Sequence, residues 1–147
     1  MQPHQQFLSA LYGYKDEDLW ILVWTKGARK LSHWTQDPAT LDIPALAGAN
    51  DVYVGCGLSP QDCGPHGRCA AEDVAGIPGY WLDLDVAGEA HKKDNLPPSV
   101  EEALALVESA LPGLPPTVTV ASGNGLQLWW LFREPWVWAD KAERDEA

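Results

Sequence analysis

Cations, cysteines and long apolar runs are scarce in this 147-residue chain, and each scarcity excludes a class of protein. Ten Lys and Arg stand against 21 Asp and Glu, giving a formal net charge of −11. Broad non-specific duplex binding is not expected, because it depends on cations that neutralise phosphates. Only three cysteines are present, and no disulfide is expected in a reducing cytoplasm. No apolar run approaches the ~20 residues that span a bilayer, and no signal peptide opens the chain, so we expect a cytoplasmic protein without a membrane partner.

Apolar and aromatic residues are plentiful by comparison. The hydrophobic share is 46% and eight residues are Trp, so the chain can bury a substantial core and keep rings for stacking. No linker composition or internal repeat divides it, and we expect a single domain over residues 1–147. The charged stretch 139–147 is expected to be an exposed helical tail.

The pattern along the chain predicts a mixture of helices and strands. Helices are expected over 3–12 and after Ser99, where Ser99 and Glu102 have the spacing of a capping box. Strands are expected over 19–25, 51–57, 79–86, 117–121 and 126–132. The last two flank the turn 122–125, whose Asn-Gly favours a hairpin. These elements predict an α+β fold: a mixed, largely antiparallel sheet with flanking helices.

Two acids in the central strand are the first candidate site. Side chains alternate along a strand, so Asp83 and Asp85 share one face while Leu82, Leu84 and Val86 share the other. Two neighbouring carboxylates repel each other unless a cation lies between them, and Mg²⁺ or Mn²⁺ prefers such ligands. The pair therefore predicts a divalent metal site, with a solvated strand face as the alternative.

Three segments together resemble the archaeo-eukaryotic primase superfamily. They are the strand 81–86, the stretch 93–99 with the helix that follows it, and the hairpin 121–132. The closest likeness is to the primase-polymerase domains of plasmids, viruses and other mobile elements, and it extends from Phe7 to Phe132. The resemblance implies the catalytic core of a DNA primase-polymerase, a nucleotidyltransferase that uses nucleoside triphosphates and a single-stranded DNA template. It also implies Mg²⁺ or Mn²⁺ as cofactor and a helicase domain or protein as partner.

The resemblance assigns roles to individual residues. Asp83 and Asp85 correspond to the acids that hold the catalytic metals. Gly125, Leu126 and Gln127 correspond to a small-x-His motif, whose histidine contacts the phosphates of the incoming nucleotide. Ser122 and Gly123 belong to the same glycine-rich hairpin, where backbone N–H groups can meet a phosphate; the alternative is a purely structural turn. Three cations are further candidates for contact with phosphate or template, namely Lys92, Lys93 and Arg68, with solvated loops as the alternative.

Two departures from the family pattern concern activity. Gln127 can donate hydrogen bonds to phosphate but carries no charge, and no convincing third acid follows the hairpin, because Asp140 lies in a charged helical context. Either residues beyond Ala147 complete the polymerase, or the chain is a degenerate member. The alternatives are a non-catalytic nucleotide-binding or nucleic-acid-binding module derived from this fold, and an unrelated metal-dependent phosphohydrolase.

A second metal site is suggested by the loop between two strands. Cys63, His66 and Cys69 have local metal-ligand spacing, and Cys56 could supply a fourth ligand for Zn²⁺. The spacing is not that of a standard zinc knuckle. Buried free thiols are the alternative.

Overall fold

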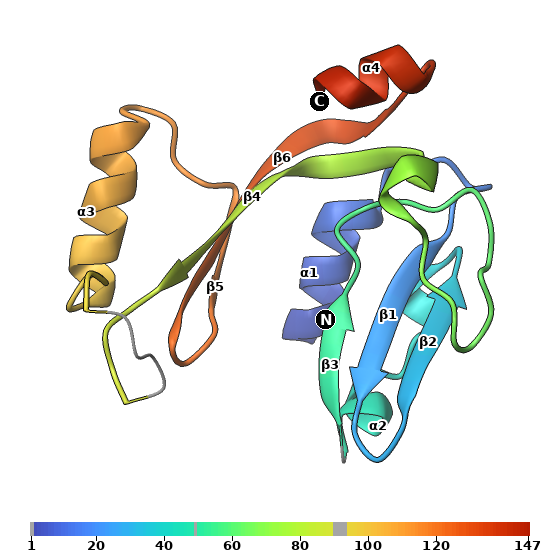
Figure 1. Cartoon of the computed structure of the whole chain (residues 1–147), viewed down its shortest axis with the longest axis horizontal. Coiled ribbons are helices and arrows are strands. Elements are labelled where there is room, and N and C mark those ends of the chain that lie inside the picture. The colour runs from blue at the N-terminus through green and yellow to red at the C-terminus, as the bar shows by residue number, and fades with distance from the viewer. Residues whose placement is uncertain (1, 49, 90–93) are drawn as a thin grey trace. The chain divides into compact units, whose positions relative to one another are not determined.

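The structure is a computed structural model that describes residues 2–48, 50–89 and 94–147. Its helices and strands are, in chain order, α1 (Pro3–Tyr12), β1 (Ile21–Lys26), β2 (Lys30–Thr35), α2 (Ile43–Ala47), β3 (Asp51–Val54), β4 (Gly76–Asp85), α3 (Val100–Ala110), β5 (Val118–Ala121), β6 (Gly125–Val137) and α4 (Lys141–Glu146) (Figure 1). The α+β class is confirmed, and the strands of the described residues form two antiparallel three-stranded sheets, ordered β2-β1-β3 and β4-β6-β5. Within these residues, no helix is both long and apolar enough to cross a membrane.

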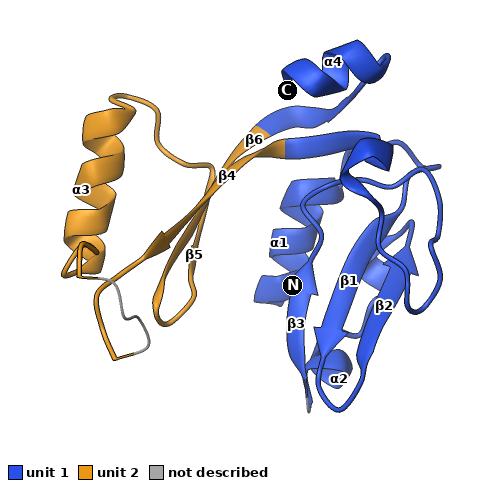
Figure 2. Cartoon of the chain, viewed as in Figure 1, with its two compact units in different colours: residues 1–78, 132–147 blue, residues 79–131 orange. Residues whose placement is uncertain are grey.

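The chain divides into two compact units, which are coloured separately in Figure 2. Unit 1 comprises Met1–Pro78 and Phe132–Ala147, and unit 2 comprises Gly79–Leu131. Strands β4 and β6 each begin in one unit and end in the other. The boundary therefore lies inside two strands, which is why the composition of the chain shows no linker.

The core of unit 1 is built from α1 and the sheet β2-β1-β3. Pro3 occupies the first turn of α1, where its missing N–H costs nothing, and Leu8, Leu11 and Tyr12 are buried. In β1 the alternate residues Ile21 and Val23 are fully buried, as expected for one face of a strand packed against a core. The Tyr12 hydroxyl donates to the carbonyl of Gly55, just beyond β3, and so ties α1 to the sheet.

Strand β2 was not expected from the sequence. It pairs with β1 over its whole length, from Lys30 opposite Lys26 to Thr35 opposite Ile21. The loop after β3 lies along its free edge: the Ser32 N–H donates to the Pro65 carbonyl at 2.8 Å, and the Trp34 indole N–H donates to the Gly64 carbonyl at 3.0 Å. These two hydrogen bonds satisfy N–H groups of β2, and the sequence of β2 alone does not predict them.

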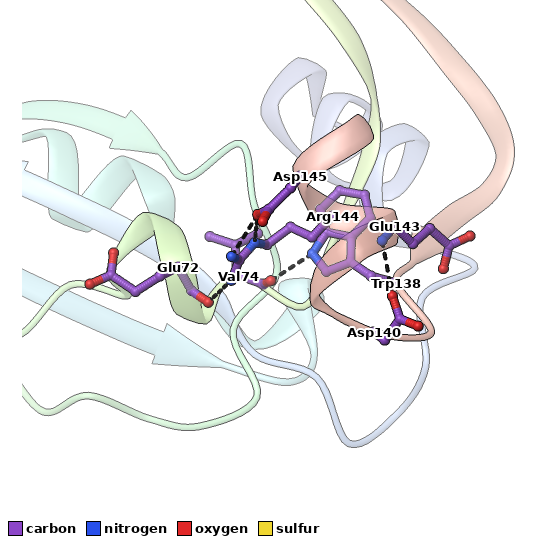
Figure 3. A network of polar contacts seen from close by, with 7 residues as sticks. All are labelled: Glu72, Val74, Trp138, Asp140, Glu143, Arg144 and Asp145. Atoms are coloured by element: carbon purple, nitrogen blue, oxygen red, sulfur yellow. Dashed lines mark hydrogen bonds and ion pairs between the residues drawn. The ribbon is translucent and has the colours of Figure 1, made fainter.

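The C-terminal segment of unit 1 ends in α4, as expected of a helical tail (Figure 3). Asp140 caps this helix by accepting from the Glu143 N–H at 2.9 Å. The helix is anchored as well as exposed, because Glu143 accepts from the Trp136 indole and Arg144 donates to the Glu72 carbonyl. Close by, the Trp138 indole donates to the Val74 carbonyl at 2.6 Å.

In unit 2, α3 packs on one face of β5 and of the parts of β4 and β6 that lie within Gly79–Leu131. Ser99 is the N-cap of α3, as predicted, and accepts from the Glu102 N–H at 3.2 Å. Its buried residues Ala103 and Val107 pack against Leu126 and Leu128 of β6. Three partly buried residues extend this cluster, namely Leu84, Val86 and Trp130. The helix therefore covers the face of the sheet to which the even-numbered residues of β4 and β6 belong.

Candidate nucleotide and metal site

Strand β4 holds the two candidate acids on the face turned away from α3. Leu84 packs into the α3 cluster, so its neighbours Asp83 and Asp85 point to the opposite face, as the alternation predicts. Asp83 is exposed and Asp85 is half-buried. Both carboxylates can therefore be approached from the same side of the sheet.

Strand β6 brings Gln127 to the same face by the same logic. Leu126 and Leu128 are buried under α3, and Gln127 between them is exposed on the other side. Trp129, two residues further along, shares its face with Gln127.

Close approaches of β4 and β6 set the register between these strands. A Cβ atom added to Gly79 would collide with the backbone of Trp130, and one added to Gly125 would collide with that of Leu84. At the hairpin end, the Val86 N–H donates to the Asn124 carbonyl at 3.1 Å. Both strands need glycine here, because no side chain fits between backbones at these points.

Because Gly125 lies against Asp85 and Gly79 lies against Leu131, Asp83 is placed across from Gln127 and Trp81 across from Trp129. The two indoles are in contact, with ring centroids 5.6 Å apart and planes tilted by 31°. A carboxylate pair, an amide and a partly exposed indole therefore share one sheet face. The place of Trp81 on this face was not recognised from the sequence, although its alternation with Asp83 could have indicated it.

The hairpin turn was correctly predicted between β5 and β6. The Ser122 N–H donates to the Gly125 carbonyl at 3.0 Å, and Gly123 has a φ of +89°, a conformation that favours glycine. Ser122 and Gly123 are both exposed. Backbone geometry alone accounts for both glycines, so a phosphate contact at this turn remains a prediction.

The candidate cations are not all in unit 2. Arg68 lies in unit 1, where its guanidinium is 5.5 Å from the ring centroid of Trp24. Lys92 and Lys93 lie outside the described residues.

Asp140, the acid that follows the hairpin in the sequence, lies in unit 1 and serves as the N-cap of α4. Among the described residues no three His, Cys, Asp or Glu side chains are grouped as ligands for one metal ion.

The proposed zinc ligands lie in the loop of unit 1 without forming such a group. The sulfur of Cys63 is 4.0 Å from the Ser59 hydroxyl, and that of Cys69 is 3.5 Å from the Ala70 carbonyl. Burial raises the pKa of the Cys56 thiol to about 11, so this thiol is neutral at physiological pH. The zinc site of Cys63, His66 and Cys69 with Cys56 as fourth ligand stays a prediction, because the described residues do not bring these ligands together.

No protein-family model, curated protein or solved structure matches the chain. The likeness to primase-polymerases therefore rests on the residues themselves: the acids of β4 and the glycine-rich hairpin before Gln127. The geometry above is the physical basis for any function assigned to them.

Proposed function

We propose that this chain is a primase-polymerase-like domain that binds a nucleoside triphosphate with Mg²⁺ or Mn²⁺, for nucleotidyl transfer in the replication of a mobile element. One observation carries the proposal: Asp83, Asp85 and Gln127 share the sheet face opposite α3. Two carboxylates on one face suit a hard divalent cation that takes its remaining ligands from water and triphosphate. Two carboxylates are enough for a cation that also binds water and phosphate oxygens, but too few for a site in which the protein supplies every ligand.

Each residue of this face has a distinct task in the proposed complex. The carboxylates of Asp83 and Asp85 hold the cation, which when bound neutralises phosphate charge and orients the triphosphate. The Gln127 amide donates a hydrogen bond to a phosphate oxygen. Trp81 is 46% exposed and rests on the buried Trp129, so it presents a supported ring for a base.

Turnover by the domain as it stands is expected to be weak or absent. Family members use three acids, and the described residues provide two on this face. Replacing a phosphate-contacting imidazolium by the neutral Gln127 removes a charge-assisted bond, which costs about 1.5–3 kcal/mol. Binding of metal-nucleotide should survive these losses better than catalysis, because metal placement supplies much of the transition-state stabilisation.

A non-catalytic nucleotide-binding module is the second candidate. The incomplete acid set favours it, while the paired indoles of Trp81 and Trp129 are useful to a binder without any chemistry. Primer synthesis and primer extension with Mn²⁺ separate the two: robust synthesis identifies a polymerase, and nucleotide binding without synthesis identifies the module.

Calorimetric titration with Mn²⁺, in the presence and absence of a nucleoside triphosphate, tests the site itself. Asp83→Asn and Asp85→Asn should each weaken metal-nucleotide binding at least tenfold, because each removes one charged ligand (about 1.4 kcal/mol per tenfold). Asp94→Asn is the matched control, since it removes an acid of unit 2 outside β4. Undiminished binding by both β4 variants would refute the assignment.

A further inference from the structure

The outer face of the sheet in unit 1 carries aromatic and basic side chains together. Ile21, Val23 and Thr25 of β1 are buried in the core, so the residues between them belong to the opposite face. There Trp24 is half-buried and Lys26 is exposed. Packing of the core of unit 1 does not explain why aromatic and basic side chains lie together on this outer face.

Trp24 is the centre of this face. Across the strand pairs it lies opposite Tyr53 of β3 and opposite Ser32 of β2. The rings of Trp24 and Tyr53 are in contact, with centroids 5.2 Å apart and planes tilted by 49°. The guanidinium of Arg68 lies 5.5 Å from the Trp24 ring centroid. Tyr53 is nevertheless 48% exposed, so part of this aromatic pair remains open to a ligand.

The cations of the chain are concentrated around these rings. Lys26, Arg29 and Lys30 form the end of the β1–β2 hairpin, and all three are exposed. With Arg68 they make four of the ten Lys and Arg in a chain of net charge −11. Asp51, opposite Lys26, offsets part of this charge. A local cluster of cations in an acidic protein indicates an anionic ligand.

Ser32 adds an independent sign that this face is incomplete. Ser32 is buried, with 7% of the residue exposed, and within the described residues its hydroxyl has no hydrogen-bond partner. An unsatisfied buried hydroxyl costs free energy, and a polar ligand atom or water beside Trp24 would relieve that cost.

We propose that this face, hereafter the Trp24 surface (Trp24, Lys26, Arg29, Lys30, Tyr53 and Arg68), binds single-stranded DNA. Exposed rings stack on unpaired bases while cations contact the phosphates, which is how proteins hold single strands without sequence preference. In a duplex the bases stack on each other, so they are not available to stack on the rings of Trp24 and Tyr53. The choice of DNA over RNA rests on the proposed function, nucleotidyl transfer in replication, for which a single-stranded DNA template is expected.

The test is fluorescence anisotropy of a labelled twelve-nucleotide oligo-dT with the full chain in EDTA, so that no metal at Asp83 contributes. Tyr53→Ala should weaken binding about tenfold, because loss of base stacking is worth about 1–3 kcal/mol per base. The double variant Lys26→Ala, Lys30→Ala should weaken binding and flatten its dependence on salt by about 1.4 in the log–log slope.

Two matched variants control for surface changes in general. Tyr14→Ala removes a ring that is 79% exposed, and Lys141→Ala removes an exposed cation of α4. Neither residue belongs to the Trp24 surface, so both should leave affinity and salt slope unchanged. Circular dichroism should show that all variants are folded, as expected for substitutions of exposed side chains.

Three outcomes would overturn the proposal: no binding of oligo-dT, equal losses in the controls, or tighter binding of oligo-rU or of duplex than of oligo-dT. The experiment is separate from the test of the metal site. Asp83→Asn should retain oligo-dT binding in EDTA, and Tyr53→Ala should retain binding of metal-nucleotide. Either site can therefore fail while the other stands.

Discussion

Trp81 on β4 and Trp129 on β6 lie ring against ring, with centroids 5.6 Å apart. Trp129 is buried, being 4% exposed, whereas nearly half of Trp81 is accessible. The inner ring thus supports the outer one, which keeps Trp81 in place beside Asp83. An indole held in this way loses little conformational entropy when a base stacks on it.

Trp81→Ala should weaken nucleoside triphosphate binding in the presence of Mn²⁺ by about tenfold, because stacking of one base is worth about 1–3 kcal/mol. Calorimetry gives the affinity. Tyr80→Ala is the control, since Tyr80 is similarly exposed, on the same strand, but belongs to the face of α3. Equal affinities of the parent and the Trp81 variant would mean that no base meets this ring.

Gln127→His should strengthen nucleotide binding, and the gain should be larger at pH 6 than at pH 8. The physical reason is that imidazole has an ordinary pKa near 6.5, so it is mostly cationic only at the lower pH and can then form a charge-assisted bond to phosphate. The expected gain at pH 6 is about tenfold.

Gln127→Leu provides the opposite control for that position. It removes both hydrogen-bond donors and leaves an apolar side chain of comparable volume, so its affinity should fall below that of the parent at both pH values. If the His and Leu variants bind alike, Gln127 does not touch the nucleotide.

The parts of the fold that local patterns encode were predictable. Helix α1 was expected over 3–12 and is found at those residues, because Pro3 and the spacing of Phe7, Leu8 and Leu11 mark its start and its buried side. The cap at Ser99 was likewise correct. Such signals depend on a few neighbouring residues, and the chain folds locally as they indicate.

The parts that depend on partners distant in sequence were not predictable. Strand β2 has the sequence Lys-Leu-Ser-His-Trp-Thr, whose apolar residues do not alternate, and pairing with β1 makes it a strand. Strand β6 continues to Val137, past Pro135, because its later residues pair with the start of β4.

The candidate site was predictable only in part, for the same reason. The alternation along β4 was enough to place Asp83 and Asp85 together. The position of Asp83 across from Gln127 depends on the register between β4 and β6. The close approaches at Gly79 and Gly125 set this register. Of the Trp24 surface only Arg68 was a candidate from the sequence, because recognising the rest requires β2 and the loop that brings Arg68 over Trp24.

Gly125→Ala should destabilise the protein by about 1–3 kcal/mol, the usual cost of forcing an extra methyl into packed structure. The added Cβ would meet the Leu84 carbonyl oxygen, so β4 and β6 would have to separate. Urea unfolding gives the free energy. Gly88→Ala should stay within about 0.5 kcal/mol of the parent, because apart from its chain neighbours no atom of the described residues lies within 4 Å of a Cβ placed there. Equal stabilities of the two variants would contradict the proposed register.

The final prediction concerns stability in alkaline solution and involves Tyr12. This side chain is 1% exposed, and burial raises the pKa of its hydroxyl far above the ordinary value of 10.0, with a smaller contribution from Cys56. Above pH 10 the unfolded chain therefore releases a proton that the folded chain retains. Because the folded state binds more protons there, its stability falls as the pH rises.

From Tyr12 alone, the free energy of unfolding should be constant up to about pH 9.5 and then fall by about 1.4 kcal/mol per pH unit above pH 10. Urea unfolding of the parent at pH 8, 10 and 11 measures this loss. Tyr12→Phe should be less stable at pH 8, since its ring no longer donates to the Gly55 carbonyl, but should show a smaller loss at pH 11. Tyr14→Phe changes an exposed hydroxyl and should retain the full alkaline loss of the parent. Parallel curves for the parent and the Tyr12 variant would show that another group controls the alkaline transition.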